Sequence, residues 1–252
     1  MDVKGLAAIV TGAASGLGEA TARQLAKAGA KVAIFDMNMD AAQKVADDIG
    51  GIAVECNVSD AQSAQDAFAK AREAHGVARI VVSCAGIAPA SKIVGRNGAH
   101  DLDLFSKVIN VNLVGTFNMS RLACEDMLTQ DPINGEERGV VVNTASIAFA
   151  DGQIGQAAYA ASKGGVASLT LPIAREMASK GIRVMTIAPG IMATPMLLNM
   201  PQEVQDALNA SVPFGRMGKP EEFASLVQHI AENAYLSGEV IRMDGALRMA
   251  PK

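Results

Sequence analysis

Short apolar runs alternate with longer amphipathic segments along the whole chain, and this alternation limits the possible folds more than any other feature. The short runs are mostly β-branched, as is typical of strands buried on both faces of a sheet. They are residues 6–10, 32–35, 52–54, 80–82, 140–142, 184–187 and 239–241. The longer segments carry apolar residues at spacings of three and four, which predicts helices over 19–28, 41–49, 61–74, 102–128, 157–179 and 221–232. Ser59 and Gln62 predict a capping box before the third helix.

Regular alternation of strands and helices predicts parallel strands joined by right-handed crossovers. Two architectures have this order, an open doubly wound sheet and an eight-stranded barrel. Seven predicted strands, with a glycine-rich turn after the first, favour the open sheet. We therefore expect a single α/β domain over residues 1–252, built on a doubly wound, Rossmann-like parallel sheet of seven strands. Two long loops, near 89–100 and 192–218, are expected to border the substrate.

Composition excludes several classes of protein. Half of the residues are hydrophobic and the net charge is −4, which leaves no basic footprint for nucleic acid. No apolar run is long enough to cross a membrane, and the start of the chain is too short for a signal peptide. The three cysteines, Cys56, Cys84 and Cys124, are isolated, so we expect neither a metal site nor a disulfide framework. Together these features predict a cytoplasmic protein.

A glycine-rich turn follows the first predicted strand. Residues 11–18 read TGAASGLG, which places Ser15 and Leu17 between the glycines Gly12, Gly16 and Gly18. Glycines allow a tight turn here and let backbone N–H groups approach a pyrophosphate at the start of the next helix. The spacing differs from the usual G-x-G-x-x-G, so the turn alone is a weak signal.

Asp36 ends the second predicted strand, 18 residues after Gly18. A carboxylate there can accept hydrogen bonds from the ribose hydroxyls of NAD and would repel the 2′-phosphate of NADP. The neighbouring Ser15 and Met37 carry no positive charge that could pair with that phosphate. These residues favour NAD as the cofactor. A methyltransferase that binds adenosylmethionine would share the same features, so this half of the chain does not define the chemistry.

Three residues in the second half of the chain can handle a proton. Ser146 follows the fifth predicted strand, at the sheet edge where ligands bind in open α/β folds. Tyr159 and Lys163 are four apart on the next helix and share a face. A nearby ammonium favours the phenolate, so we expect Lys163 to lower the pKa of Tyr159. The phenol can then exchange a proton with an alcohol or ketone whose oxygen Ser146 holds. This group predicts an oxidoreductase.

These motifs together resemble the classical short-chain dehydrogenase/reductase family over essentially the whole chain. The family pattern TGxxxGxG matches residues 11–18, and its YxxxK matches Tyr159 and Lys163. Its catalytic serine matches Ser146, and its helix asparagine, taken to hold a water in a proton relay, matches Asn112. The resemblance also implies that Lys163 binds the nicotinamide ribose. The further cofactor contacts that it implies are Asn57, Val58, Ala85, Gly86, Pro189, Gly190, Ile191 and Thr194.

Two motifs depart from the family pattern. Its Asn-Asn-Ala-Gly is Ser83-Cys84-Ala85-Gly86 here, so we expect the contact between the central strands to be made differently. Its Asp-Val pair after the third strand is Asn57-Val58, and an amide can still hydrogen-bond the adenine amino group. We expect this substitution to weaken adenine binding without abolishing it.

A narrower resemblance is to the type 2 3-hydroxyacyl-CoA dehydrogenases, also called type 10 17β-hydroxysteroid dehydrogenases. It is carried by the segments NTASI, GQAAY, SKGG, TLPIAR, VMTIAPG and GEVIRMDGA, and by an extended loop that starts at Ala90. The resemblance implies reversible oxidation of (S)-3-hydroxyacyl-CoA to 3-oxoacyl-CoA with NAD. Lys92 and Arg96 on this loop are candidates for binding the phosphates of coenzyme A, or are simply solvated charges. A homotetramer through helices 102–128 and 157–179 is also implied.

Two alternative functions remain open from the sequence. One is an NAD-dependent dehydrogenase of a steroid or another secondary alcohol, because the fold does not define the substrate. The other is a catalytically idle NAD-binding regulatory or scaffold protein. An idle site has no physical need for Ser146, Tyr159, Lys163 and Asn112 together, so these four residues favour an enzyme.

Overall fold

The computed structural model describes residues 1–96 and 98–251. Seven parallel strands form one sheet in the order β3-β2-β1-β4-β7-β8-β9, so the predicted doubly wound sheet is confirmed. The strands are β1 (Ala7–Thr11), β2 (Lys31–Asp36), β3 (Ile52–Glu55), β4 (Ala78–Ser83), β7 (Gly139–Thr144), β8 (Ile182–Pro189) and β9 (Val240–Met243). Every residue of β1, β7 and β8 is buried, as the runs of β-branched residues predict.

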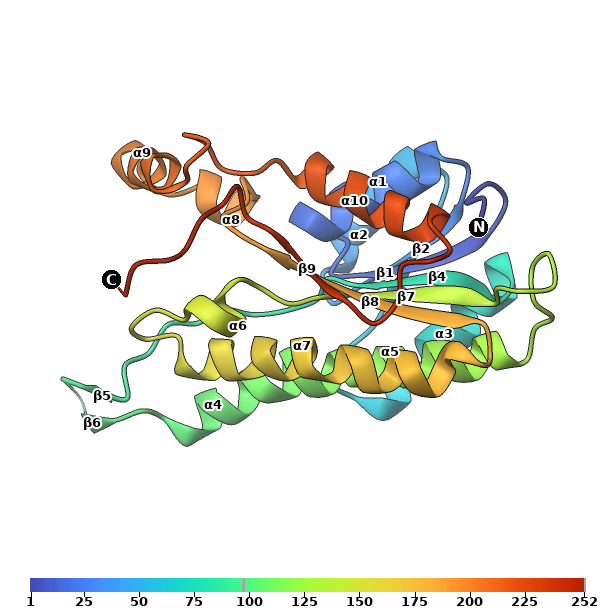
Figure 1. The fold of residues 1–252 in the computed structure, drawn as a ribbon, viewed down its shortest axis with the longest axis horizontal. Helices are drawn as coiled ribbons and strands as arrows, with labels where there is room; N and C mark the ends of the chain where they lie inside the picture. Colours follow the sequence, from blue (N-terminus) through green and yellow to red (C-terminus); the bar gives the residue numbers. More distant parts are fainter. Residues whose placement is uncertain (97, 252) are drawn as a thin grey trace.

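Helices cover both faces of the sheet (Figure 1). One face packs against α1 (Gly16–Lys27), α2 (Met39–Ile49) and α10 (Pro220–Glu232), and its core includes Leu25, Val45 and Phe223. The other face packs against α3 (Ala61–His75), α5 (Gly115–Leu128) and α7 (Ala157–Ala178), with a core that includes Phe68, Met119 and Met127. The two cores hold the sheet from both sides and leave its carboxyl edge free to form a site.

The predicted helix over 102–128 contains an irregularity that the sequence pattern did not reveal. It comprises α4 (Leu102–Ile109), a π-helical turn η1 (Asn110–Val114) and α5. Such turns insert an extra residue and are frequent at functional sites.

The start of α3 also differs from the prediction. Its cap is Asp60, whose side chain accepts a hydrogen bond from Ser63 N at 2.7 Å, so the capping box of Ser59 and Gln62 is wrong by one residue.

The two long loops contain short elements of their own. Within 89–100, β5 (Val94–Gly95) pairs with β6 (Gly98–Ala99) in a small antiparallel hairpin. Within 192–218 lie two helices that the proline-rich sequence did not predict, α8 (Pro195–Leu198) and α9 (Gln202–Ser211). A further short helix, α6 (Ala148–Asp151), connects β7 to α7.

No helix in the described residues is long and apolar enough to span a membrane.

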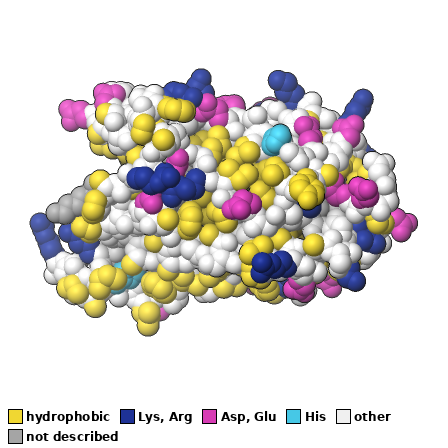
Figure 2. Space-filling model, in the orientation of Figure 1, with side chains coloured by type: hydrophobic (Ala, Val, Ile, Leu, Met, Phe, Trp, Pro, Cys, Tyr) yellow, Lys and Arg dark blue, Asp and Glu magenta, His cyan; other side chains and the backbone are white. Residues whose placement is uncertain are grey.

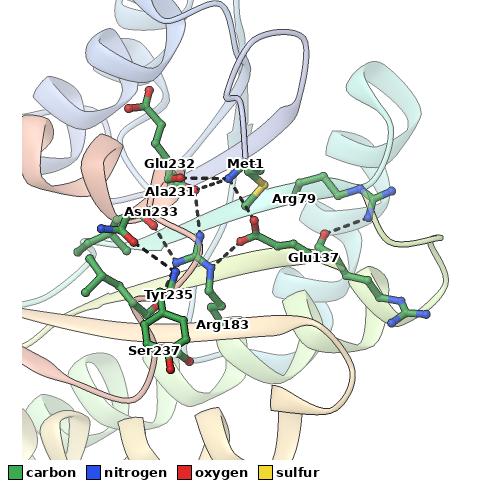
Figure 3. Close-up of polar contacts among 12 residues, drawn as sticks. Met1, Arg79, Glu137, Arg183, Ala231, Glu232, Asn233, Tyr235 and Ser237 are labelled. Carbon is green, nitrogen blue, oxygen red and sulfur yellow. Dashed lines mark hydrogen bonds and ion pairs between the residues drawn. The ribbon is translucent and has the colours of Figure 1, made fainter. Parts of the chain in front are cut away.

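A buried ionic cluster closes the amino edge of the sheet, opposite the carboxyl edge (Figure 3). Arg183, at the start of β8, donates to Glu137 at 2.6 Å and to the backbone oxygens of Ile230, Ala231 and Leu236. The Met1 ammonium donates to the other oxygen of Glu137 at 3.1 Å. This cluster therefore ties β8 to the end of α10 and to the turn that precedes β9.

Candidate active site

A cleft of about 500 Å³ lies at the carboxyl ends of the first four strands. Most of the predicted cofactor contacts line it, namely Gly12, Ser15, Gly16, Leu17, Gly18, Asp36, Asn57, Val58, Ala85, Gly86 and Thr194. Phe35, Met37, Cys56, Cys84, Ile87, Val111 and Pro195 also line it, although no motif singled them out as cofactor contacts. Parallel order brings these strand ends to one edge, which is why residues far apart in sequence meet here.

The glycine turn after β1 is too crowded for side chains at Gly12 and Gly18. Gly12 has a φ of +63°, and a Cβ there would lie 2.7 Å from the backbone of Ala85. A Cβ on Gly18 would also clash with the carbonyl oxygen of Gly12, whereas Gly16 has room for a Cβ and favours glycine through its φ of +59°. Ser15 is the N-cap of α1 and its side chain makes no capping bond. The start of α1 thus offers backbone N–H groups at the cleft, which suits a pyrophosphate.

Asp36 is held at the cleft by two backbone groups. Its Oδ2 accepts from Ala14 N at 3.0 Å and its Oδ1 from Asn38 N at 2.9 Å. Among the described residues that line the cleft, none is Lys or Arg. A carboxylate fixed in this way, without a nearby cation, suits the ribose hydroxyls of a dinucleotide and disfavours an added phosphate.

The two departures from the family pattern have structural consequences. Asn57 Oδ1 accepts from both the backbone N and the Oγ of Ser59, at 3.1 and 2.8 Å, so the amide oxygen predicted to meet adenine is already engaged twice. Ser83 and Asn143 are paired in register on β4 and β7. Within residues 1–96 and 98–251, neither Ser83 Oγ nor Asn143 Nδ2 finds a hydrogen-bond partner. The shorter Ser83 therefore leaves this contact between the central strands unmade.

Thr11 is an organising residue that motif analysis did not single out for a role. Its hydroxyl oxygen accepts from Cys84 N and Ala85 N, each at 3.1 Å. These bonds join the end of β1 to the loop after β4 and so shape the floor of the cleft. The only available signal was the position of Thr11 at the start of the glycine motif.

Ser146, Tyr159 and Lys163 meet at the carboxyl end of β7. Lys163 Nζ lies 5.9 Å from the centre of the Tyr159 ring and donates to Thr144 O at 2.7 Å. A Cβ on Gly86 would lie 3.6 Å from the same Nζ, so the ammonium borders the cofactor cleft. Ser146 Oγ accepts from Ala148 N at 3.2 Å. The carbonyl of Thr144, which fixes the lysine, is a backbone group and has no sequence signature.

Burial controls the protonation of this group. It raises the pKa of Tyr159, against a smaller lowering by the side-chain contact with Ser146. The expected lowering of the Tyr159 pKa by Lys163 is therefore not met: the contact that lowers this pKa is with Ser146, and desolvation of the phenolate outweighs it. Burial also lowers the pKa of Lys163 from 10.5 to about 8. The lysine still carries its charge at neutral pH, when an uncharged phenol can donate a proton.

Asn112 lies in the π-helical turn and is fully buried. Its Oδ1 accepts from Ile87 N at 2.8 Å, and its Nδ2 donates to Ile87 O and to Ser162 Oγ at 2.9 and 3.0 Å. Ser162 Oγ in turn donates to Tyr159 O at 2.7 Å. The side chain thus connects the loop after β4 to the helix that carries Tyr159 and Lys163.

The three predicted contacts at the end of β8 and just after it lie away from the cleft lining. Pro189 ends β8, and Gly190 N donates to Met243 O at 2.9 Å. Ile191 lines a separate hollow of about 140 Å³ beside Val212 and Phe214. The chain returns to the cleft only at Thr194.

The fold and this site define an oxidoreductase of the short-chain dehydrogenase/reductase class. A family model described as "Enoyl-(Acyl carrier protein) reductase" matches residues 12–247. The chain therefore belongs to the short-chain dehydrogenase/reductase family, whose members use a nicotinamide cofactor.

Named relatives cover nearly the whole chain. The chain is 49% identical to the "3-hydroxyacyl-CoA dehydrogenase type-2" of Bos taurus and 48% identical to that of Homo sapiens, over 99% of this chain and 97% of each relative. It is 36% identical to the "3-oxoacyl-[acyl-carrier-protein] reductase FabG" of Thermotoga maritima. A crystal structure of "3-hydroxyacyl-CoA dehydrogenase type-2 from Mycobacterium avium" superposes with a TM-score of 0.94 at 42% identity, covering 98% of both chains.

Proposed function

We propose that this protein catalyses the NAD-dependent, reversible oxidation of (S)-3-hydroxyacyl-CoA to 3-oxoacyl-CoA. The observation that carries the proposal is the group of Ser146, Tyr159 and Lys163 beside a dinucleotide cleft. The acyl-CoA part is supported by relatives of that name, which share about half of the residues across the full length. When bound, the nicotinamide ring supplies the hydride chemistry.

The protein groups supply proton transfer and orientation. Tyr159 takes the proton of the substrate hydroxyl in oxidation and returns it in reduction. Ser146 hydrogen-bonds the same oxygen, so it stabilises charge that develops there. The Lys163 ammonium lies close enough to favour the phenolate when it forms, and it can also bind a ribose hydroxyl. Asn112 connects the loop after β4 to α7, the helix that carries Tyr159 and Lys163, and so keeps the two segments in a fixed relative position.

NAD rather than NADP is the proposed cofactor, because the Asp36 carboxylate is fixed at the adenosine end of the cleft. We expect NADH to bind at least tenfold more tightly than NADPH, measured by the change in fluorescence of the reduced nicotinamide on binding or by calorimetry. Asp36→Ser should reduce this preference, because the variant should bind NADH more weakly and no longer repel the 2′-phosphate of NADPH. An unchanged ratio in the variant would contradict the assignment of Asp36.

The loop over 89–100 is proposed to receive the coenzyme A part of the substrate. A hollow of about 460 Å³ lies between Lys92, Ile93 and Val94 on this loop and the segment 152–157 that leads to Tyr159. Ser91 N donates to Gly155 O at 2.8 Å, which anchors the loop beside the site. Figure 2 shows a hollow between the part that carries α9 and the part that carries β5 and β6, with Lys and Arg side chains gathered in it. These features suit a ligand with an apolar arm and phosphates.

Charge reversal tests the phosphate contacts. Lys92→Glu with Arg96→Glu should raise the KM for acetoacetyl-CoA several-fold, because two attractive charges become repulsive. The KM for the phosphate-free acetoacetyl thioester of N-acetylcysteamine should change little. Equal KM changes for both substrates, or none for either, would remove these residues from the proposal.

The segment 192–218 is proposed to close over the bound substrate. Thr194 and Pro195, at the start of α8, line the cleft, and α9 has no buried residue among those described. Few buried contacts make such a segment free to move. Hydrogen exchange over 192–218 should therefore slow when NAD and substrate are both present. Exchange that stays the same would argue against closure.

A homotetramer through α4–α5 and α7 is also proposed. Phe117, Leu128 and Leu171 on these helices are large apolar side chains that are more than two-fifths exposed. Phe117 and Leu128 also border a groove of about 570 Å³. Such exposed apolar surface is typical of an interface. Light scattering after size exclusion should report a mass near four chains, and Phe117→Glu should reduce it.

A reducing compartment such as the cytoplasm is the proposed location. Its support is that Cys56, Cys84 and Cys124 are all free thiols. Cell fractionation with an antibody against the protein tests this location directly.

The main experiment is the initial rate of NADH oxidation with acetoacetyl-CoA, for wild type and Tyr159→Phe. We expect rapid turnover that falls by about 10³-fold or more in the variant, which lacks the proton donor. NADPH and free acetoacetate serve as controls for the cofactor and for the CoA part. No turnover by a wild-type protein that binds NADH would leave the steroid or other alcohol dehydrogenase, or the idle regulatory protein, as the function.

A further inference from the structure

The connector between the two proton-handling residues is held by distant parts of the chain. This connector, residues 147–156, joins Ser146 to the helix of Tyr159. Its own contacts begin with Ile147 N, which donates to Pro189 O at 3.1 Å, and end with Gly155 O, which accepts from Ser91 N. Between these two points, its partners come from β9 and from the segment after it.

Arg242 on β9 is the centre of these contacts. Its Nη2 donates to Asp151 Oδ2 at 2.6 Å and to Leu247 O at 3.1 Å, and its Nε donates to Asp244 Oδ2 at 2.8 Å. The three side chains are mostly buried, with 21%, 15% and 8% of Arg242, Asp151 and Asp244 exposed. One planar guanidinium thus joins α6, β9 and the segment after β9, a geometry that lysine cannot reproduce.

The segment 245–251 turns sharply after β9 and then runs along the connector. Gly245 and Ala246 both have positive φ, +59° and +66°, and the turn is held by Asp244 Oδ1, which accepts from Ala246 N. A non-glycine residue in this region is strained, and such strain persists only where surrounding contacts impose it. Further along, Ala250 O accepts from Gln153 Nε2 at 2.9 Å and Pro251 O accepts from Ile154 N at 3.1 Å.

The same segment also packs against the residue next to Ser146. Leu247 is buried in a small apolar cluster with Ile147 and Val212, and Ile191 and Met249 pack on its edge. The connector is therefore fixed by an ion pair at Asp151, by hydrogen bonds from the Gln153 side chain and the Ile154 backbone N–H to segment 245–251, and by packing at Ile147. The hydrogen bonds and the packing depend on the path of segment 245–251, which Arg242 constrains through Asp244 and Leu247 O, whereas the ion pair joins Asp151 to Arg242 directly.

We propose that Arg242 is a positioning residue for the reaction: through Asp151 and segment 245–251, it holds the connector so that Ser146 and Tyr159 face the same substrate oxygen. Arg242 touches neither of these two side chains in the described contacts, so its effect passes through the connector. Reaction rates are sensitive to errors of about 1 Å in such alignments. The kinetic part of this inference rests on the proposed function, whereas the structural part rests on the contacts alone.

Arg242→Gln tests the inference, with Arg183→Gln as the matched control. Both arginines are buried, pair with a carboxylate and donate to backbone oxygens, but Arg183 lies at the amino edge of the sheet. Arg242→Gln should lower kcat by about tenfold or more, with the KM for acetoacetyl-CoA changed less than about threefold, because alignment matters mainly in the transition state. The Kd for NADH should stay within about twofold. Arg183→Gln should lower the urea midpoint while kcat stays within about twofold.

Hydrogen exchange gives a readout that does not depend on the substrate. Peptides covering 147–158 should exchange faster in Arg242→Gln and unchanged in Arg183→Gln. Arg242→Lys should give values of kcat and exchange rate between those of wild type and Arg242→Gln, since lysine keeps the positive charge but cannot reproduce the planar hydrogen-bonding geometry of the guanidinium. If Arg242→Gln does not fold, Asp151→Asn removes the same link with a smaller perturbation.

Each result has a defined meaning. Unchanged exchange over 147–158, or a kcat that falls equally in both glutamine variants, would overturn the positioning role. A wild-type protein inactive on acetoacetyl-CoA would refute the acyl-CoA proposal alone, and the exchange comparison would still decide the role of Arg242.

Discussion

Lys163 and Tyr159 show how burial changes the protonation of single residues. Desolvation disfavours the charged form of each, so the pKa of the tyrosine rises and that of the lysine falls to about 8. The two shifts bring the pKa of the lysine close to physiological pH and keep the phenol protonated at that pH. The side chain that must accept a proton during oxidation is therefore protonated at rest, so oxidation of the alcohol should speed up as rising pH deprotonates it.

The lysine also makes folding stability depend on pH in a defined window. Between the folded pKa of about 8 and the ordinary value of 10.5, the unfolded chain binds more protons than the folded protein. The free energy of unfolding contributed by this residue must therefore rise with pH across that window, by at most about 1.4 kcal/mol per pH unit. Urea unfolding of wild type and Lys163→Met at pH 7.5, 8.5 and 9.5 measures the difference between them. A constant difference would show that the lysine is not desolvated as the structure indicates.

At the scale of elements, the turn from β1 to α1 shows two separate demands on glycine. Gly12 needs a positive φ and also a missing Cβ, because Ala85 lies 2.7 Å from the place where it would be. Gly50 ends α2 with a φ of +66° and has nothing within 4 Å. The first glycine lets the backbone approach a ligand site, and the second only allows a helix to end.

This pair of glycines gives a matched test of the turn. Gly50→Ala should cost about 1 kcal/mol, the price of a left-handed conformation for alanine. Gly12→Ala should cost more and also weaken NADH binding by tenfold or more, because the loop after β4 must move away. Urea titration and NADH fluorescence measure the two effects. Equal stability losses with normal NADH binding in both variants would contradict the crowding at Gly12.

At the scale of the whole molecule, the two edges of the sheet have different tasks. The carboxyl edge carries the cleft and the proton-handling residues, whereas the amino edge carries the buried cluster of Arg183 and Glu137 (Figure 3). The length of the strands separates the two, so stability and catalysis can be altered independently.

Glu137→Gln should show this separation. It leaves the Arg183 charge buried without its carboxylate, which costs about 3 kcal/mol or more in comparable buried pairs. The kcat measured well below the unfolding temperature should nevertheless remain within about twofold of wild type. A marked loss of activity in fully folded variant protein would mean that the amino edge communicates with the site.

Much of the site could be predicted because strand ends in a parallel sheet meet at one edge. Gly12 and Asp36 were assigned from local patterns, Gly86 and Thr194 from the family resemblance, and all four line one cleft. The doubly wound sheet also followed from local pattern, since seven β-branched runs separated by helices leave few alternatives. The helices over 195–198 and 202–211 were missed because their prolines and weak periodicity are typical of loops.

What the sequence by itself determined was the order of the elements and the chemical groups at their ends, because periodicity and glycine spacing are local properties. The tertiary structure decided the rest. It made the Thr144 carbonyl the partner of Lys163, raised the pKa of Tyr159 by burial, and left Ser83 Oγ and Asn143 Nδ2 without a hydrogen-bond partner among the described residues. It also brought Arg242 to Asp151, 91 residues away. Such contacts and desolvation depend on which distant atoms pack together, and no local pattern encodes them.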